Sequence, residues 1–226
     1  MSTFVLKLIA CIAMLIDHVT KLFVDENTVL WTIGCGIGRL AFPIFCFLIV
    51  EGLFYTRNRK KYALRLLIAA VISEVPYDLM RFGTVWNFDS QNVIWTLLLG
   101  LLGIVIIEHT KVKFPGDTFK YNIFSCLAIF VCGCAALFCA TDYSVYGVML
   151  VVSFYMFRGH KFAPFFMLLF LNLAFYSKSM IQFAALLACP VLILYNGKKG
   201  PDDKYCLYAF YPVHMLLLWL LVRFVV

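Results

Sequence analysis

The feature that most constrains the fold of this chain is a series of long apolar segments that carry no polar stripe. The first of them, from Phe4 to Val24, is apolar on every side apart from a few ionisable residues. A surface helix of a soluble protein keeps charged residues along one side, whereas a helix that is apolar all round lies in a core or a bilayer. With 64% hydrophobic and 14% charged residues and a mean hydropathy of +0.93, the chain has too little charge to cover a soluble domain. The sequence therefore predicts an integral membrane protein.

The lengths of these segments set the number of expected membrane crossings, because roughly 17–25 apolar residues span a bilayer as one helix. Nine segments are predicted, at about 4–24, 38–56, 62–80, 92–109, 120–140, 143–157, 162–176, 179–195 and 205–225. The predicted fold class is all-α: a polytopic membrane helical bundle of about nine transmembrane helices, built as a single domain over residues 1–226. Three of the later segments are at or below the usual minimum length, so one of them is expected to be tilted, re-entrant or joined to its neighbour.

Lysine and arginine are distributed unevenly between the two ends of these segments. If the N-terminus is cytosolic, fourteen of the nineteen lie on the cytosolic side, which leaves five outside. The cytosolic set is Lys7, Arg57, Arg59, Lys60, Lys61, Arg65, Lys111, Lys113, Lys120, Arg158, Lys161, Lys198, Lys199 and Lys204. Because short cytosolic loops accumulate these residues, we expect a cytosolic N-terminus in a multi-pass protein of the cytoplasmic membrane. The net charge of +7 then reflects topology and contact with the lipid bilayer, and no nucleic-acid partner is expected.

The nine cysteines indicate neither a disulfide framework nor a metal site. Most of them lie within apolar runs, and no CxxC pair occurs. A free cysteine in such a run behaves as a small hydrophobic residue. We therefore expect the cysteines to fill the core, and no metal site is predicted.

Asp17 and His18 lie side by side near the far end of the first segment. At a rise of ~1.5 Å per residue, His18 lies roughly 21 Å beyond Phe4, in the outer half of a hydrocarbon core of ~30 Å. Further polar residues are expected at a similar depth: Arg39, Glu74, Asp78, Asn92 and Thr96, with His214 near the middle of the last segment. Ionisable groups in membrane segments are costly and usually face a cavity, so the set predicts a polar cavity near the outer face. Singly, each residue also fits a structural role, such as an ion pair between Asp78 and Arg81.

Helix geometry makes Asp17 and His18 point in different directions from the first segment. Neighbouring residues on a helix point about 100° apart, so Asp17 is poorly placed to orient His18, and an acid from another helix is expected to do so. Glu74 and Asp78 share one face at a spacing of four. Glu74 is favoured because it lies about 6 Å deeper and has no obvious cation on its own helix.

Several motifs together resemble one family of membrane proteins. They are "MLIDH" (14–18), "GRLAFPIFCFLIVEGLFYTRNRKKYALRLL" (38–67), "SEVPYD" (73–78), "NVIWTLLLG" (92–100) and "LYAFYPVHMLLLWL" (207–220). The chain resembles the TraX family of F-pilin acetylase-like multipass membrane acyltransferases. The resemblance implies transfer of an acetyl or acyl group from cytosolic acetyl-CoA to an amine or hydroxyl acceptor at the outer face.

The polar residues of the outer half suit that implied chemistry. His18 is the candidate base, because the unperturbed pKa of histidine lies near working pH. Glu74, Asp78 and Asp17 are the candidate acids of the site, and Arg39, Asn92 or His214 is expected to polarise the acetyl carbonyl. Two routes stay open: direct attack by the acceptor on the thioester, or an acetyl group carried on His18 and then passed on.

The basic end is where the donor is expected to bind. Arg57, Lys60 and Lys61, together with Arg59, Lys198 and Lys199, are candidates to hold the phosphates of coenzyme A, although each also fits topological anchoring. Glu51 is expected to pair with Arg57 or to line the donor route, and Asn92 and Thr96 are further candidate donor contacts. The glycines of "GCGIG" (34–38) are expected to form a flexible outer loop before Arg39.

Several acceptors and several classes of function fit the sequence. A peptide N-terminus, an amino sugar or a cell-wall polymer all fit the implied transfer. The second hypothesis is a transporter or immunity-type membrane protein that uses the same polar cavity for binding, and the third is a structural subunit of an envelope assembly. A transporter is expected to show broken helices in matching positions of two halves and an internal repeat, and neither is visible in the sequence.

Overall fold

The computed structural model describes residues 1–160, 162–201 and 204–225, with the side chains of 204–207 and 225 left out. The elements in chain order are α1 (Thr3–Phe23), α2 (Val29–Gly38), α3 (Ala41–Tyr55), α4 (Arg59–Phe82), α5 (Val93–Lys113), α6 (Thr118–Phe138), α7 (Ser144–Met156), α8 (Ala163–Tyr176), the 3-10 helix η1 (Met180–Leu187), α9 (Ala188–Ile193) and α10 (Lys204–Val225). Within the described residues there is no strand, only an isolated bridge between Gln91 and Thr141. The prediction of an all-α fold is confirmed.

Part of the bundle consists of helices long enough to span a membrane. Among the described residues, four helical stretches are long and apolar enough to cross a bilayer: Thr3–Phe23, Val29–Tyr55, Val93–Lys113 and Thr118–Phe138. Four further apolar helices are shorter. Each predicted segment falls on helical residues. The count of about nine crossings stays a prediction.

The segment before Arg39 is helical, where the sequence analysis expected a flexible loop. Helix α2 covers residues 29–38 and packs against the end of α1. A Cβ at Gly38 would lie 2.3 Å from the Cβ of Asp17, and one at Gly34 would lie 2.1 Å from the hydroxyl of Thr20. These glycines therefore allow two helices to approach closely, and the expectation of a loop was wrong.

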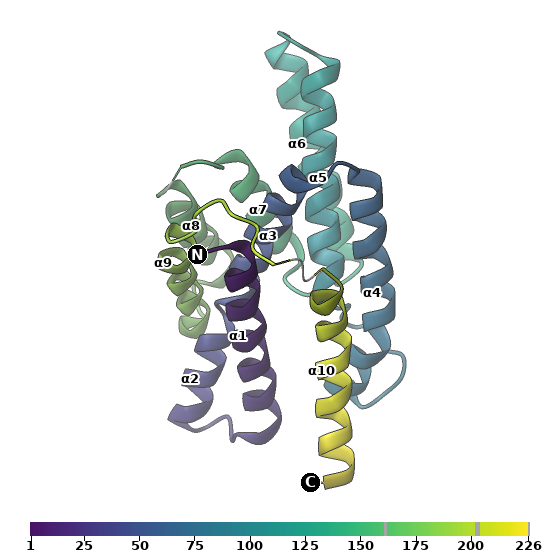
Figure 1. Ribbon diagram of the computed structural model, residues 1–226, viewed down its shortest axis with the longest axis vertical. Coiled ribbons are helices and arrows are strands. Elements are labelled where there is room, and N and C mark those ends of the chain that lie inside the picture. The colour runs from purple at the N-terminus through teal and green to yellow at the C-terminus, as the bar shows by residue number, and fades with distance from the viewer. Residues whose placement is uncertain (161, 202–203, 226) are drawn as a thin grey trace.

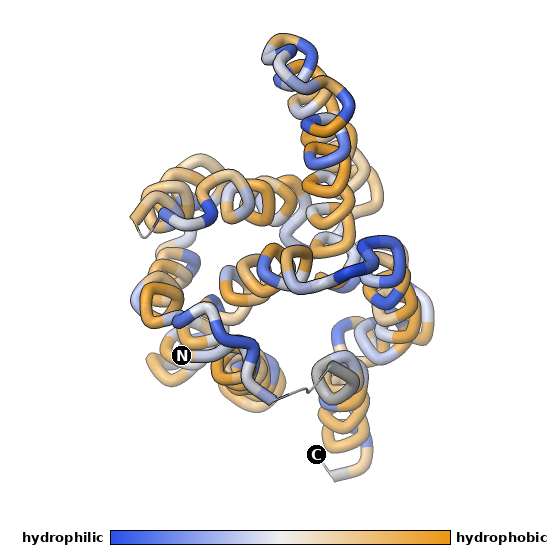
Figure 2. Tube along the Cα trace, turned by 45° about the horizontal axis from the view of Figure 1, so that its top comes forward, coloured by the Kyte–Doolittle hydropathy of each residue, from blue (hydrophilic) through white to orange (hydrophobic). Residues whose placement is uncertain are grey.

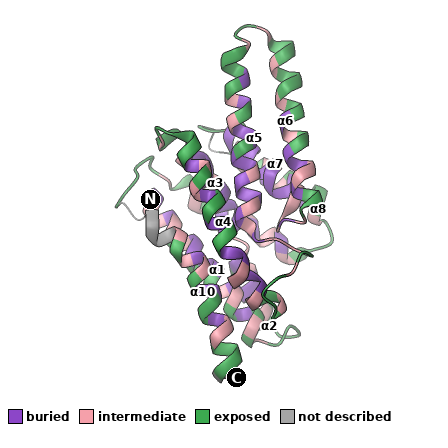
Figure 3. Ribbon diagram, turned by 90° about the vertical axis from the view of Figure 1, so that its right-hand side faces the viewer, coloured by how far each residue is buried: buried purple, intermediate pink, exposed green. Residues whose placement is uncertain are grey.

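The helices form one bundle in which α3 is central (Figure 1). It contacts α1, α5, α7, η1 and α9, while α10 packs mainly against α4. The buried residues concentrate in the middle of the bundle, and the far ends of α6 and α10 are exposed (Figure 3). Many exposed positions are nevertheless large and apolar, such as Phe130 on α6 and Phe170 on α8. In a water-soluble protein such a surface would drive aggregation, whereas it suits contact with lipid.

The connections alternate between two ends of the bundle. We call the end that holds residue 3 and the α3–α4, α5–α6, α7–α8 and α9–α10 connections the amino-terminal end (Figure 1). Hydrophilic residues gather at the connections, most clearly around the start of α4 and the tip of the α5–α6 hairpin (Figure 2). The basic residues assigned to the cytosol lie at or near this end, apart from Lys161, which is outside the described residues. That this end faces the cytosol stays a prediction.

Two connections at the opposite end are joined to each other. The backbone N–H of Gln91 donates to the carbonyl of Ala140 at 3.0 Å, and the N–H of Asp142 donates to the carbonyl of Gln91 at 2.9 Å. The hydroxyl of Thr96 also donates to the Asp142 carbonyl. These bonds hold the segment between α6 and α7, and with it Asp142 and Tyr143, against the start of α5.

Candidate functional site

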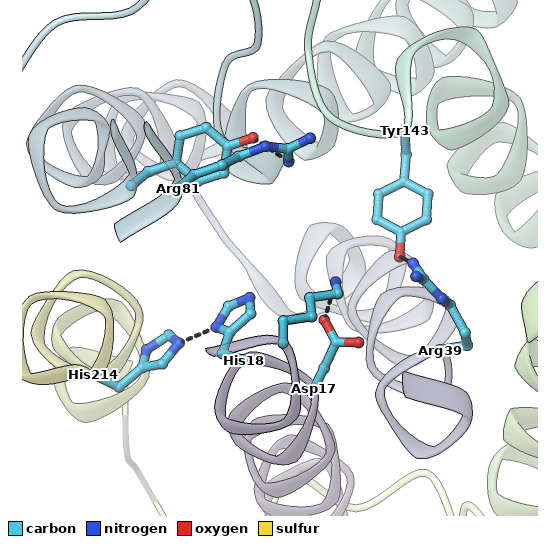
Figure 4. Close-up of polar contacts among 8 residues, drawn as sticks. Asp17, His18, Arg39, Arg81, Tyr143 and His214 are labelled. Atoms are coloured by element: carbon cyan, nitrogen blue, oxygen red, sulfur yellow. Dashed lines mark hydrogen bonds and ion pairs between the residues drawn. The ribbon is translucent and has the colours of Figure 1, made fainter. Parts of the chain in front are cut away.

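The most unusual side-chain contact in the bundle joins two histidines from opposite ends of the sequence. Nδ1 of His18 on α1 lies 2.8 Å from Nε2 of His214 on α10, and the two rings are nearly parallel with centroids 5.0 Å apart (Figure 4). Nδ1 of His214 lies 2.7 Å from the backbone carbonyl of Phe210, one turn earlier on the same helix. His214 is 5% exposed, so water does not replace these partners.

The hydrogen-bond chain assigns the protons of both rings. A carbonyl oxygen only accepts, so Nδ1 of His214 must be the donor to Phe210. In a neutral imidazole the other nitrogen is then an acceptor, so Nε2 of His214 accepts from Nδ1–H of His18. The remaining nitrogen of His18, Nε2, consequently carries a free lone pair. The partner that orients His18 is thus a histidine of the last helix, where the sequence analysis expected a carboxylate.

Asp17 lies beside His18 but has a different partner. Its Oδ2 accepts from Nζ of Lys21 at 2.5 Å, one turn along α1, and no bond joins Asp17 to His18 (Figure 4). This agrees with the separation expected from helix geometry. Asp17 faces α2, where Gly38 makes room for it.

Arg39 is positioned by the break between α2 and α3. Its backbone caps α2, and its Nη1 donates to the hydroxyl of Tyr143 at 3.1 Å (Figure 4). The Tyr143 ring stacks on Phe42 with centroids 3.8 Å apart, which fixes the hydroxyl. Because that hydroxyl accepts from Arg39, its own proton remains available to another acceptor.

A cavity of about 470 Å³, which we call the histidine cavity, is lined by His18 but not by His214. Its polar lining residues are Asp17, His18, Lys21, Arg39, Tyr77, Arg81, Asp142, Tyr143 and Tyr211. Burial raises the pKa of the Asp142 carboxyl above its ordinary value, although the neighbouring cations Arg81, Lys21 and Arg39 act in the opposite direction. The cavity therefore combines a histidine with a free lone pair and several cationic donors.

A second cavity of about 490 Å³ extends toward the basic end, and we call it the amino-end cavity. Its charged lining residues are Lys7, Glu51, Arg57, Arg65 and Lys199. Four residues line both cavities: Met14, Phe45, Val93 and Tyr211. The two cavities thus adjoin at a shared wall of side chains, between α1, α3, α5 and α10.

Glu74 does not contact His18 or Arg39 through any hydrogen bond or ion pair of the described residues. Its carboxylate instead accepts from the backbone N–H of Asn92 at 3.1 Å, from the Asn92 amide at 2.5 Å and from the indole N–H of Trp95 at 2.7 Å. The expectation that Glu74 takes a partner from another helix is met, but with other residues than those proposed. Glu74 fixes the start of α5 to α4.

Asn92 and Thr96 are committed to the fold as well. Asn92 caps α5 by accepting from the Ile94 N–H at 3.0 Å, and its amide also donates to the Ala70 carbonyl at 2.8 Å. The Thr96 hydroxyl, which donates to the Asp142 carbonyl, also lies 2.9 Å from the hydroxyl of Thr141. Neither residue lines either cavity. The structure therefore leaves Asn92 without a free donor for a carbonyl and gives no support to either residue as a donor contact.

Asp78 accepts from the backbone N–H of Asn87 at 3.0 Å, which anchors the α4–α5 connection. The ion pair expected between Asp78 and Arg81 is absent among the described residues: Arg81 donates instead to the hydroxyl of Tyr77 at 2.7 Å. The expected ion pair was wrong, because Arg81 bonds to Tyr77, one turn earlier on the same helix, and lines the histidine cavity.

Glu51 lines the amino-end cavity, as expected, but its ion partner is Arg158 rather than Arg57. Arg158 Nε lies 2.7 Å from Glu51, and the Tyr195 hydroxyl donates to the same carboxylate at 2.9 Å. Arg57 lines this cavity, whereas Lys60 and Lys61 are exposed on the first turn of α4 and do not. Of the predicted phosphate contacts, the structure thus brings Arg57 and Lys199 to the cavity.

Tyr143, Tyr77, Tyr211 and Arg65 were not singled out from the sequence. Tyrosines near the ends of apolar segments usually belong to the interfacial belt, so position alone does not distinguish them. The one signal in the sequence for Tyr143 is its position directly after Asp142, where the polar connection ends and the apolar segment at 143–157 begins.

The comparisons with known proteins agree with the motifs. The family model described as TraX protein matches residues 2–222. The chain belongs to the TraX family. A curated protein from Dichelobacter nodosus, described as probable fimbrial assembly protein FimC of serogroup H1, is 33% identical over 246 aligned residues, covering 96% of this chain and 94% of that protein. No solved structure matches the chain.

In this TraX-family chain the resembling motifs converge in space. "MLIDH" supplies Met14, Asp17 and His18, the start of the 38–67 motif supplies Arg39, and "YPVH" supplies His214. Separate parts of the sequence thus build one site around the histidine pair.

Proposed function

We propose that this protein is a membrane acyltransferase that moves an acetyl group from acetyl-CoA to an amine or hydroxyl acceptor. The observation that carries the proposal is the meeting of two cavities beside His18. One reaches toward the basic end and the other toward the opposite end, and they share Met14, Phe45, Val93 and Tyr211. A donor and an acceptor that enter from different ends would meet at this wall.

The arrangement of His18 suits general-base catalysis. Nε2 takes the proton of the acceptor amine or hydroxyl, the acceptor forms its bond to the acetyl carbon, and the thiolate of coenzyme A leaves. The imidazolium formed on His18 keeps its Nδ1–H bonded to His214, which orients it and shares its charge. His18 then returns the proton to the departing thiolate. In the second route, Nε2 itself attacks the thioester and carries the acetyl group before the acceptor arrives.

Arg39 is the best placed group to polarise the acetyl carbonyl. His214 has both nitrogens engaged and Asn92 is occupied at the start of α5, so neither has a donor to spare. Arg39 keeps further N–H donors beyond the one given to Tyr143, and the Tyr143 hydroxyl offers a second donor. Charge-assisted donors fixed before the reaction stabilise a developing oxyanion strongly.

The donor fits the amino-end cavity by charge and by shape. Lys7, Arg57, Arg65 and Lys199 bring positive charge to it, as the phosphates of coenzyme A require. The apolar side chains deeper in the cavity suit the thin pantetheine arm, whose thioester must reach the shared wall. If this end is cytosolic, cytosolic acetyl-CoA reaches the site without crossing the membrane.

The similarity to a fimbrial assembly protein suggests the biological setting. We propose that the acceptor belongs to the fimbriae or pili of the cell surface, and that a peptide amine is the first candidate to test. An amino sugar or a cell-wall polymer is the alternative acceptor.

The deciding experiment uses the full-length protein purified in detergent with acetyl-labelled acetyl-CoA. We expect label on the protein or on an added peptide amine, and faster release of coenzyme A than without protein. His18→Ala should abolish this, while His109→Ala should not, because His109 is exposed on α5 and lines neither cavity.

The competing function is transport, since two cavities separated by a thin wall also suit a transporter. Acetyl-CoA turnover that is absent in detergent, together with uptake of a solute into vesicles that depends on the same residues, would reject the enzyme. Turnover that survives in His18→Ala would reject the mechanism while keeping the activity.

A further inference from the structure

Arg81 is a cation of the histidine cavity that the proposed transfer does not use. It lies in the last turn of α4, just before Gly83 ends the helix in a left-handed conformation with φ of 69°. It is exposed and also lines the cavity, so it stands at the opening. An acceptor that enters from this end passes it before reaching His18.

The side chain of Arg81 is held over the cavity rather than extended toward lipid headgroups. Its Nη1 donates to the hydroxyl of Tyr77 at 2.7 Å, and Tyr77 is itself 4% exposed and bonded to Ser90 at 2.9 Å. The guanidinium also lies 5.6 Å from the ring centres of Tyr77 and Phe82. An arginine that only anchors a helix end reaches outward and is mobile. Arg81 instead bonds to Tyr77 beside the cavity, and its other N–H donors have no hydrogen-bond partner among the described residues (Figure 4).

Among the described residues, Arg81 has no carboxylate at ion-pair distance, although Asp142 lines the same cavity and is influenced by the charge of Arg81. The lining residues include three cations, Lys21, Arg39 and Arg81, and two carboxylates, Asp17 and Asp142, so the balance is +1 with neutral histidine. Asp17 is paired with Lys21. Among the residues that the structure describes, neither arginine forms an ion pair, and Asp142 forms none. A partly enclosed cavity with a net positive charge attracts an anion.

We propose that the acceptor carries an anionic group, a carboxylate or a phosphate, and that Arg81 binds this group at the opening of the histidine cavity while the nucleophile reaches Nε2 of His18. This rests on the proposed function for the nucleophile, but the anion site itself does not. Arg39 lies on the far wall beside Tyr143 and acts on the acetyl carbonyl, so the two arginines have separate roles (Figure 4). A guanidinium is well suited to such a group because its planar donors match both carboxylate and phosphate oxygens.

The kinetic test compares acceptors that differ only in an anionic group. Phosphoethanolamine is set against ethanolamine, and glucosamine 6-phosphate against glucosamine, with labelled acetyl-CoA and the detergent-purified full-length protein. We expect KM to be about tenfold or more lower for the anionic member, the size of one charge-assisted hydrogen bond. Arg81→Gln should remove this preference by raising KM for the anionic acceptors alone, whereas Arg39→Gln should lower kcat for every acceptor. Equal KM values within both pairs would overturn the inference.

A binding test does not depend on turnover. Thermal unfolding is followed with inorganic phosphate or with chloride at the same ionic strength, and again with phosphatidylglycerol in the micelles. We expect phosphate to stabilise the wild type and Lys178→Gln, an exposed cation of the α8–η1 connection that lines neither cavity, and to leave Arg81→Gln unaffected.

The outcomes separate the two proposals and the two sources of phosphate. Stabilisation by phosphate without any acetyl transfer would keep the anion site and reject the enzyme. Transfer without a phosphate effect, and without an acceptor preference, would do the reverse. Stabilisation by the anionic lipid alone would mean that Arg81 binds a headgroup, and would also overturn the inference.

Discussion

The histidine pair makes a quantitative prediction about His214. If His214 only orients His18, replacing it should weaken catalysis far less than replacing the base. The substitution His214→Leu removes the acceptor for Nδ1–H of His18 and keeps a buried apolar side chain in its place. His18 then loses the preference for the tautomer whose Nε2 has a free lone pair.

The expected size follows from the lost bond. A neutral hydrogen bond contributes about 0.5–1.5 kcal/mol, which corresponds to about a 2- to 12-fold change in the population of the productive tautomer. Loss of a general base costs about 10²- to 10⁴-fold. We therefore expect kcat to fall by about 2- to 12-fold in His214→Leu and by two or more orders of magnitude in His18→Ala. His214→Gln should lie between wild type and His214→Leu, because the glutamine carbonyl can accept from Nδ1–H.

The assay is the initial rate of coenzyme A release with a saturating acceptor, with the folded fraction of each variant measured by size exclusion. The double variant His18→Ala/His214→Leu should be no slower than His18→Ala, since the second histidine acts only through the first. Losses that add in the double variant, or a His214→Leu variant as slow as His18→Ala, would show that His214 acts on the substrate directly and would refute the orienting role.

Further expectations concern the flanking acids, the α4 acids and the topology. Asp17→Asn should lower the rate much less than His18→Ala does, because the Asp17 carboxylate is bonded to α1 and not to the base; equal losses would contradict this. Glu74→Gln should lower stability by about 1–3 kcal/mol, because it disturbs charge-assisted bonds to α5, and Asp78→Asn should cost less, since Asp78 has one described bond. Thermal unfolding and the transfer rate are measured for both variants. A Glu74→Gln variant that folds normally but is inactive would show that Glu74 belongs to the site. Cysteines placed at 57–61 should react with impermeant reagents only from the cytosolic side; labelling from outside would reverse the topology and with it the donor route.

The sequence was sufficient to predict most of the helices and the depth of the polar residues. Segment length and hydropathy located the apolar helices other than α2, and a count of residues along α1 placed His18 toward the end of the bundle opposite residue 3. Depth depends only on the rise per residue, so it can be read from position along a helix. The polar cavity around Asp17, His18 and Arg39 follows from that reasoning.

The rotation of each helix about its axis could not be predicted in the same way. Whether Glu74 faces α1 or α5 depends on packing across the bundle, and in segments that are apolar all round the hydropathy pattern gives no preferred face. His214 was placed near the middle of the last segment, but nothing in the sequence indicated that it meets His18, 196 residues away. Likewise, the glycines before Arg39 are equally compatible with a loop and with close helix packing, and only the position of α1 decides between them.

The choice of a histidine rather than a carboxylate beside His18 has a physical reason and a testable consequence. A carboxylate buried between α1 and α10 would be costly unless a cation compensated it. Asp17 is engaged by Lys21, and Glu74 by Asn92 and Trp95, so neither of these two orients His18. A neutral pair of imidazoles orients the base without that cost. We therefore expect His214→Glu to be less active than His214→Gln at neutral pH, although both side chains can accept from Nδ1–H. The glutamate would hold His18 as an imidazolium, which cannot take a proton. The rate of His214→Glu should therefore recover at alkaline pH, whereas the rate of His214→Gln should not change there. The measurement is a pH–rate profile of the two variants. Matching profiles would show that the charge of residue 214 does not affect the protonation of His18.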